Sequence, residues 1–352
     1  MQIFHQHPQR ASPHNEVHAR PPEPMCLPLA VSHIVMTCDA AQSAASSDHL
    51  ARLLRDHLLA VPDLSSTHLR MDLGAFRTRW ELHTEFVSWS FARTLDADRD
   101  DGDALVPARD AVLHAWLSAL PGQCLVAIDL WANSAADVDA VPRPAWLLND
   151  ETLVASSVAD RDARVYTDLA VHSDEFSRIF VVTNGALTPR RLGQLVQRLL
   201  EIETYRMAAL LGLPAARLAA GMLSTVESEV ATLANAIRTA SHEQEPQLLD
   251  QLTRLAAQVE GDYAATHSRF SASAAHFELV DKRIRDIAES RLPGMQTIAE
   301  FMDRRLSPAR STCEWVARRQ EALSRRISRI SNLLRTRVEI EQQLSSQALL
   351  KA

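Results

Sequence analysis

Alternating charged residues in the segment RTRWELHTE are the strongest candidates for chemistry in this sequence. An extended strand would place five polar side chains on one face: Arg77, Arg79, Glu81, His83 and Glu85. Two carboxylates beside an imidazole can bind a divalent metal ion or perform acid–base catalysis. Two guanidinium groups on the same face would neutralise these carboxylates. We therefore favour a solvent-exposed ladder of ion pairs over a ligand or partner surface, and place catalysis third.

A Pro- and His-rich arm, residues 1–28, precedes the first expected strand. Its segment HNEVHARPP supplies His18 and Arg20, which could complete a site near His83. Prolines hold such a segment extended, so we expect the arm to be a strap between subunits or domains. Its histidines lack a regular ligand spacing, and we expect no metal site.

A central helix is predicted over about residues 188–212, where apolar residues recur at intervals of three and four. Gly212 and Pro214 are expected to end it. Glu203 and Arg206 lie three residues apart, on or beside the apolar stripe, and can form an ion pair. We interpret this pair as structural rather than catalytic.

No known catalytic or cofactor motif is present. With nine glycines in 352 residues, the sequence contains no glycine-rich phosphate loop, no GxSxG elbow and no HExxH helix. The four cysteines form no CxxC pair, which argues against zinc clusters and a disulfide framework. We expect no cofactor and no catalytic residue.

The order of the predicted strands and helices along the chain indicates an α+β fold. Residues 29–185 predict a mostly antiparallel or mixed sheet with flanking helices that cover one of its faces, because short apolar runs are separated by turn residues. The expected strands are residues 31–38, 67–73, 76–83, 85–93, 124–131, 153–158, 164–172 and 177–183, and the expected helices are residues 48–60 and 108–120.

Residues 186–352 predict a stalk of long helices, with boundaries near residues 227–240, 247–292 and 308–352. Ser307 and Pro308 fit the start of the last helix. From Val316 to Leu344 apolar residues keep a spacing of three and four, which is typical of a coiled-coil seam. We therefore expect a homo-oligomer formed through the helical half.

Charge is distributed unevenly along the chain. The net charge is −11 over residues 1–185 and +4 over residues 186–352. Acids interleave with the arginines of the second half, so we interpret it as a solvated helix face and expect no nucleic-acid partner. The sequence has no run of 18 apolar residues and no signal-like N-terminus. We expect no transmembrane helix within the chain and a cytoplasmic location.

Five segments carry a resemblance to a known family: EVHARPP (Glu16–Pro22), WELHTEF (Trp80–Phe86), LVQRLLEIETYRMAALLGLP (Leu195–Pro214), RLPGMQTIAEFMDRRLSPA (Arg291–Ala309) and LLRTRVEI (Leu333–Ile340). Across nearly its whole length the chain resembles a bacterial family of uncharacterised membrane-anchored proteins, a domain of unknown function. Leu82 departs from the basic residue expected there. The resemblance implies a C-terminal apolar anchor beyond Ala352, at the cytoplasmic face of the inner membrane, and implies no activity.

These patterns together favour a non-enzymatic, self-associating cytoplasmic domain of a membrane-anchored protein. One alternative is the regulatory domain of a CorA-like ion transporter, which should respond to divalent ions through acidic loops such as residues 96–103. The other is an enzyme that uses Glu81, His83 and Glu85, which should line one concave pocket.

Overall fold

The structure is a computed structural model that describes residue 7 and residues 21–61, 67–95, 105–135, 147–241 and 243–351. The chain is 56% helical and 20% strand, and the predicted α+β class is confirmed. It divides into two compact units. The sheet unit comprises Met1–Met207 and Leu279–Met302, and the helical unit comprises Ala208–Glu278 and Asp303–Ala352.

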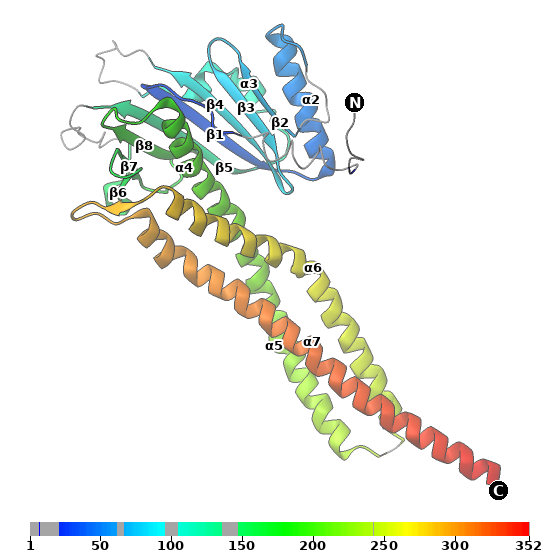
Figure 1. Ribbon diagram of the computed structural model, residues 1–352. Helices are drawn as coiled ribbons and strands as arrows, with labels where there is room; N and C mark the ends of the chain where they lie inside the picture. Colours follow the sequence, from blue (N-terminus) through cyan, green and yellow to red (C-terminus); the bar gives the residue numbers. More distant parts are fainter. Residues whose placement is uncertain are drawn as a thin grey trace. The chain divides into compact units, whose positions relative to one another are not determined.

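A nine-stranded mixed sheet forms the sheet unit, in the order β2-β3-β4-β1-β5-β8-β7-β6-β9 (Figure 1). Neighbouring strands pair antiparallel, except that β5 and β8 pair parallel. The strands are β1 (Leu29–Thr37), β2 (His68–Asp72), β3 (Arg77–Leu82), β4 (Phe86–Thr94), β5 (Gln123–Ser134), β6 (Val154–Val158), β7 (Ala163–Thr167), β8 (Ser177–Thr183) and β9 (Ser290–Arg291).

Both faces of the sheet are covered, rather than the single face that the sequence predicts. Every residue of β1 except the last is buried, because helices pack on either side of it. On one face Trp80 donates a hydrogen bond from Nε1 to the Ser46 hydroxyl of α2 (Ala40–Asp56) at 2.9 Å. On the other face His33 contacts the Thr204 hydroxyl of α4 (Pro189–Leu210).

Aromatic rings fill the core beneath α2. Trp80 and Trp89 are fully buried, and Trp89 meets Trp116 edge to face with ring centroids 5.2 Å apart. His49 stacks on Trp116 at 4.3 Å. Burying several large rings together supplies much of the hydrophobic stabilisation of this face.

Two helices before residue 185 differ from their predicted bounds. α2 begins eight residues earlier than expected because Asp39 and Gln42 form a reciprocal capping box. The single helix expected over residues 108–120 is instead a 3-10 turn, η1 (Ala108–Ala111), followed by the short α3 (His114–Leu117). Val112 lies between them with an extended backbone, which breaks the helix. A second 3-10 turn, η2 (Asp150–Thr152), precedes β6.

The central helix begins at Pro189, where Arg191 donates its backbone N–H to the Thr188 hydroxyl at 3.3 Å. Gly212 and Pro214 were expected to end the central helix, and α4 ends just before them, at Leu210. A new helix then begins at once. Only Leu211 separates α4 from α5 (Gly212–Thr239), because glycine and proline are both tolerated in the first turn of a new helix.

α6 (Glu245–Asp286) and α7 (Ile298–Lys351) each contribute to both units. The expected start of the last helix at Pro308 is wrong, since Pro308 lies inside α7. α7 begins ten residues earlier because Thr297 and Glu300 form a capping box. Glu289 also accepts backbone N–H groups of this first turn, and it accepts the Ser156 hydroxyl of β6.

Within the helical unit, α5, α6 and α7 share one apolar core (Figure 1). The seam predicted from Val316 is buried at Val316, Leu323 and Ile327. One polar layer interrupts it, where the Gln320 amide and the Thr266 hydroxyl hydrogen-bond at 3.0 Å. The buried Gln320 side chain is thus hydrogen-bonded.

The expected domain boundary at residue 185 does not coincide with the division in the structure. α4 up to Met207 lies in the sheet unit, because its apolar stripe covers the sheet. By length and composition, one helical stretch, Pro189–Thr239, could also cross a membrane, and 33% of its most apolar window is buried. The sequence contains no unbroken apolar run of that length because arginines interrupt the stretch.

Candidate functional site

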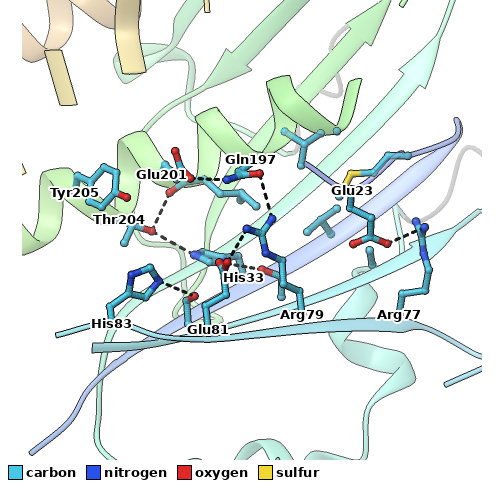
Figure 2. A pocket seen from close by; sticks show the side chains of 18 of the residues that line it. Glu23, His33, Arg77, Arg79, Glu81, His83, Gln197, Glu201, Thr204 and Tyr205 are labelled. Atoms are coloured by element: carbon cyan, nitrogen blue, oxygen red, sulfur yellow. Dashed lines mark hydrogen bonds and ion pairs between the residues drawn. The ribbon is translucent and has the colours of Figure 1, made fainter. Parts of the chain in front are cut away.

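A cavity of about 50 Å³ lies between α4 and the sheet, and all its lining residues belong to the sheet unit. Its floor consists of three small side chains of β4, namely Ser88, Ser90 and Ala92. They lie between larger side chains of β1 and β3, with which they pair in register. Small residues between large ones form a trough, and α4 covers it (Figure 2).

The roof carries four residues spaced four apart on α4: Gly193, Gln197, Glu201 and Tyr205. Residues at i and i+4 lie on one side of a helix, so these four follow one line above the trough. Burial, and next the charge of Glu201, raises the pKa of Tyr205 to about 12. The Tyr205 hydroxyl is therefore protonated and can donate a hydrogen bond.

His33 lies in the wall and is held as a neutral imidazole. Thr204 donates its hydroxyl to the Leu200 carbonyl at 2.9 Å, so it accepts from His33 Nε2 at 3.2 Å. Nδ1 then accepts from the Ser90 hydroxyl at 2.8 Å. Burial lowers the pKa of His33 to about 3, although the nearby charge of Glu81 acts in the opposite direction. Both ring nitrogens are thus engaged.

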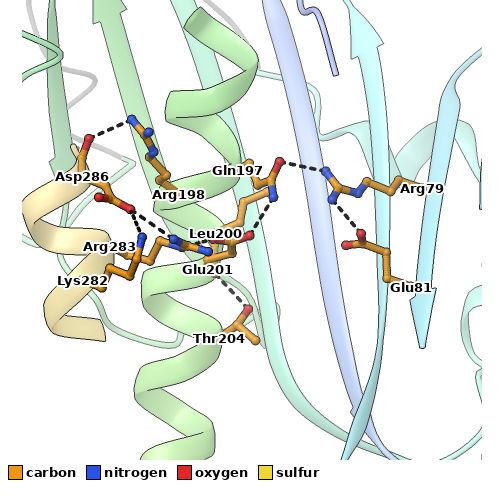
Figure 3. A network of polar contacts seen from close by, with 10 residues as sticks. All are labelled: Arg79, Glu81, Gln197, Arg198, Leu200, Glu201, Thr204, Lys282, Arg283 and Asp286. Atoms are coloured by element: carbon orange, nitrogen blue, oxygen red, sulfur yellow. Dashed lines mark hydrogen bonds and ion pairs between the residues drawn. The ribbon is translucent and has the colours of Figure 1, made fainter. Parts of the chain in front are cut away.

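A chain of polar contacts joins β3 to α4 and to the end of α6 (Figure 3). Arg79 contacts Glu81 at 2.7 Å and Gln197 at 3.2 Å. Gln197 in turn donates to Glu201 at 2.7 Å, and Glu201 accepts from Arg283. Alternating donors and acceptors satisfy each charge of this chain, so removal of one member would leave its neighbours unpaired.

The ladder of ion pairs was predicted to be exposed to solvent, and this is wrong for Arg79 and Glu81. The Arg79 and Glu81 side chains are only 12% and 13% exposed, because α4 covers their face of the sheet. His83 lines the cavity as well. Glu85 is not among the lining residues in the described part of the chain, and Phe86 lines the cavity instead. The strand ends at Leu82, and the turn that follows breaks the alternation on which the prediction depended.

The structure pairs Glu203 with Arg206, as the spacing predicts. Arg206 Nε donates to the Glu203 carboxylate at 2.8 Å, and Nη2 makes a second contact. Glu203 is 4% exposed, so this two-point ion pair is buried. It does not line the cavity, which agrees with a structural role.

Residues 23–25 close one end of the cavity. The Met25 N–H donates to the Pro189 carbonyl at 2.9 Å, and Glu23 pairs with Arg77 at 2.8 Å. His18 and Arg20, the candidates in the arm, lie outside the described residues, as does the acidic loop at residues 96–103.

Gly193 lies directly beneath this segment, and a Cβ there would lie 1.7 Å from the Glu23 carbonyl oxygen. We expect Gly193→Ala to displace residues 23–25 and to cost about 1–3 kcal/mol, the usual range for overpacking. Hydrogen–deuterium exchange over residues 21–28 should accelerate. Gly221→Ala is the matched control, since its Cβ would meet nothing and alanine should stabilise the helix by about 1 kcal/mol. Unchanged exchange in Gly193→Ala would contradict the close approach.

The sequence did not single out His33, Gln197 or Arg283. His33 is one polar residue within the apolar strand LAVSHIVMT, and such a position is the signal that could have identified it. The spacing of four from Gly193 to Tyr205 could have revealed the roof. Nothing in the sequence predicts that Arg283 lies near the cavity, because its partner Glu201 is 82 positions away along the chain.

No group of three or more His, Cys, Asp or Glu side chains that could hold a metal ion occurs among the residues the structure describes. A nine-stranded mixed sheet with a buried polar cavity, followed by long helices, defines an α+β protein. The chain belongs to the family described as "Protein of unknown function (DUF3422)", whose profile matches residues 5–352. Comparisons with curated proteins and with solved structures find no match.

Proposed function

We propose that this chain is a non-enzymatic, self-associating cytoplasmic domain of a membrane-anchored protein. The observation that carries the self-association is an exposed apolar stripe on α7, formed by Leu333, Ile340 and Leu344. The anchor rests on the resemblance to a family of membrane-anchored proteins.

The stripe has the spacing of a coiled-coil seam. Leu333, Ile340 and Leu344 are 71%, 51% and 55% exposed, and they follow one another at intervals of seven and four residues. Intervals of seven and four keep apolar side chains on one side of a helix. Leu334 and Ile327, which pack inside the helical unit, lie on a different side of α7 and are 1% exposed.

The end of α7 extends past its companion helices within the helical unit (Figure 1). Arg337 pairs with Glu245, the first residue of α6, so the residues after Arg337 continue beyond the start of that helix. A second copy of the chain offers the same stripe. Two such stripes can pack against each other around a twofold axis, which is the commonest symmetry of homo-oligomers.

We expect the double substitution Ile340→Gln and Leu344→Gln to reduce the molar mass of the assembly to that of the monomer, because it removes the apolar contact. Light scattering coupled to size-exclusion chromatography measures this. Gln342→Ser is the matched control, since Gln342 is exposed on the opposite side of the same turns and its loss should leave the mass unchanged. A wild-type chain that is monomeric at about 20–50 μM, well above the Kd of a stable dimer, would contradict the proposal.

The enzyme alternative has one observation in its favour, which is that Glu81 and His83 line the same cavity. Glu81 already binds Arg79, and the nearby His33 uses both ring nitrogens. These groups are therefore better placed to bind a molecule than to transfer protons.

A further inference from the structure

The cavity beneath α4 leaves space where a folded core is normally filled. Protein interiors pack at the density of organic crystals, and larger side chains at Ser88 or Ala92 would close the trough. Its 50 Å³ corresponds to about four water-sized spheres at roughly 10–15 Å³ each. A molecule of three to five non-hydrogen atoms would therefore fit, on the order of that number of spheres.

The walls of the cavity offer both donors and acceptors. Arg79 carries five N–H groups and makes hydrogen bonds with Glu81 and Gln197. Among the described residues its Nε–H has no hydrogen-bond partner. The Ser88 hydroxyl lies on the floor, and the Glu81 carboxylate is on the wall. A ligand that both accepts and donates hydrogen bonds would match this set.

The charges around the cavity are already balanced. Each acidic lining residue has an arginine partner, since Glu81 pairs with Arg79, Glu23 with Arg77, and Glu201 with Arg283. A ligand with a net charge would add a buried charge without a counter-charge, which is unfavourable. A molecule without net charge avoids this.

Apolar groups line the rest of the trough. Val31, Met25 and Ala92 lie at the end closed by residues 23–25, and Val196 and Leu200 project from α4. A short hydrocarbon group can pack against Leu200 while a polar group faces Arg79 and Ser88. The ligand therefore has one polar end and one small apolar end.

We propose that this cavity is a binding site for a small uncharged carboxamide. The amide oxygen accepts from the Arg79 guanidinium or the Ser88 hydroxyl, and the amide N–H₂ donates to the Glu81 carboxylate. The alkyl end packs against Leu200. This site goes beyond the proposed self-association, and it lies entirely within the sheet unit.

Acetamide and acetate test the proposal, because they share size and shape and differ in charge. Saturation-transfer difference NMR on the full chain should show transfer to the acetamide methyl group and none to acetate. Ser88→Leu fills the floor of the trough and should abolish the acetamide signal. Thr94→Leu, on the same strand but exposed, is the control that should retain it.

Acetate binding as strong as acetamide binding would overturn the inference, as would the absence of an acetamide signal in the wild-type chain. An acetamide signal that survives Ser88→Leu would do the same, since it would come from elsewhere on the molecule. If Ser88→Leu does not fold by circular dichroism, Ser88→Val fills the same part of the floor with less added volume. Its acetamide signal should then be lost, and retention would refute the site.

Discussion

Replacing Glu203 by alanine is expected to lower the free energy of unfolding by about 3–5 kcal/mol, the range for breaking a buried ion pair from one side. Arg206 would keep its charge in a site where its side chain is only 16% exposed. Without Glu203 this guanidinium loses both contacts that offset its desolvation. Urea denaturation of the wild-type and variant chains gives the difference.

Two further variants distinguish the loss of the buried ion pair from the general effect of replacing a glutamate. In the double variant Glu203→Ala with Arg206→Met, no buried charge is stranded, so much of the lost stability should return. Glu151→Ala is the matched control, because Glu151 is exposed in the same unit and its loss should cost about 0–1 kcal/mol. Equal midpoints for Glu203→Ala and Glu151→Ala would show that the pair contributes nothing.

Acidification is the second change with a large expected effect, and it acts through His33. The unfolded chain protonates this histidine below pH 6.5, whereas the folded chain does so only near its pKa of about 3. Between these values the unfolded state binds more protons, so the stability falls as the pH falls. At about 1.4 kcal/mol per pH unit, the loss is about 2 kcal/mol by pH 5 and about 4–5 kcal/mol once pH 3 is reached.

The substitution His33→Gln isolates this contribution. Glutamine can still donate to Thr204 and accept from Ser90, but it does not titrate. Between pH 7 and pH 5 the variant should lose about 2 kcal/mol less stability than the wild-type chain. His114→Gln, at an exposed position, is the control and should follow the wild-type chain. If His33→Gln and the wild-type chain lose the same stability, His33 is not held neutral by the fold.

Most strands could be predicted because their apolar runs are short and bounded by turn residues. β1, β4 and β8 were found within about two residues on that basis, a normal uncertainty for element ends. Helix ends were less predictable, because capping depends on side-chain hydrogen bonds. Ser307 and Pro308 fit a helix start as well as Thr297 does, but only Thr297 has Glu300 in the right place to complete a box.

The candidate site was predicted only in part. Alternation placed Arg79 and Glu81 on one face of a strand, and the structure agrees with that placement. Nothing in the local sequence shows that α4 covers this face, since the two segments are separated by more than 100 positions. The exposure of the ladder was therefore misjudged. A buried polar face and a solvated one have the same local pattern.

The pairing of β9 with β6 has a consequence for the order in which the chain folds. The Ser156–Glu289 contact at this edge joins residues that are 133 positions apart in the sequence, and such distant contacts form slowly. During synthesis, β6 is made long before Ser290 and Arg291 reach it. In that interval its backbone N–H and C=O groups are an open edge that another nascent chain can pair with. Chaperone binding or misassembly should therefore be greatest in the period before residue 291 leaves the ribosome.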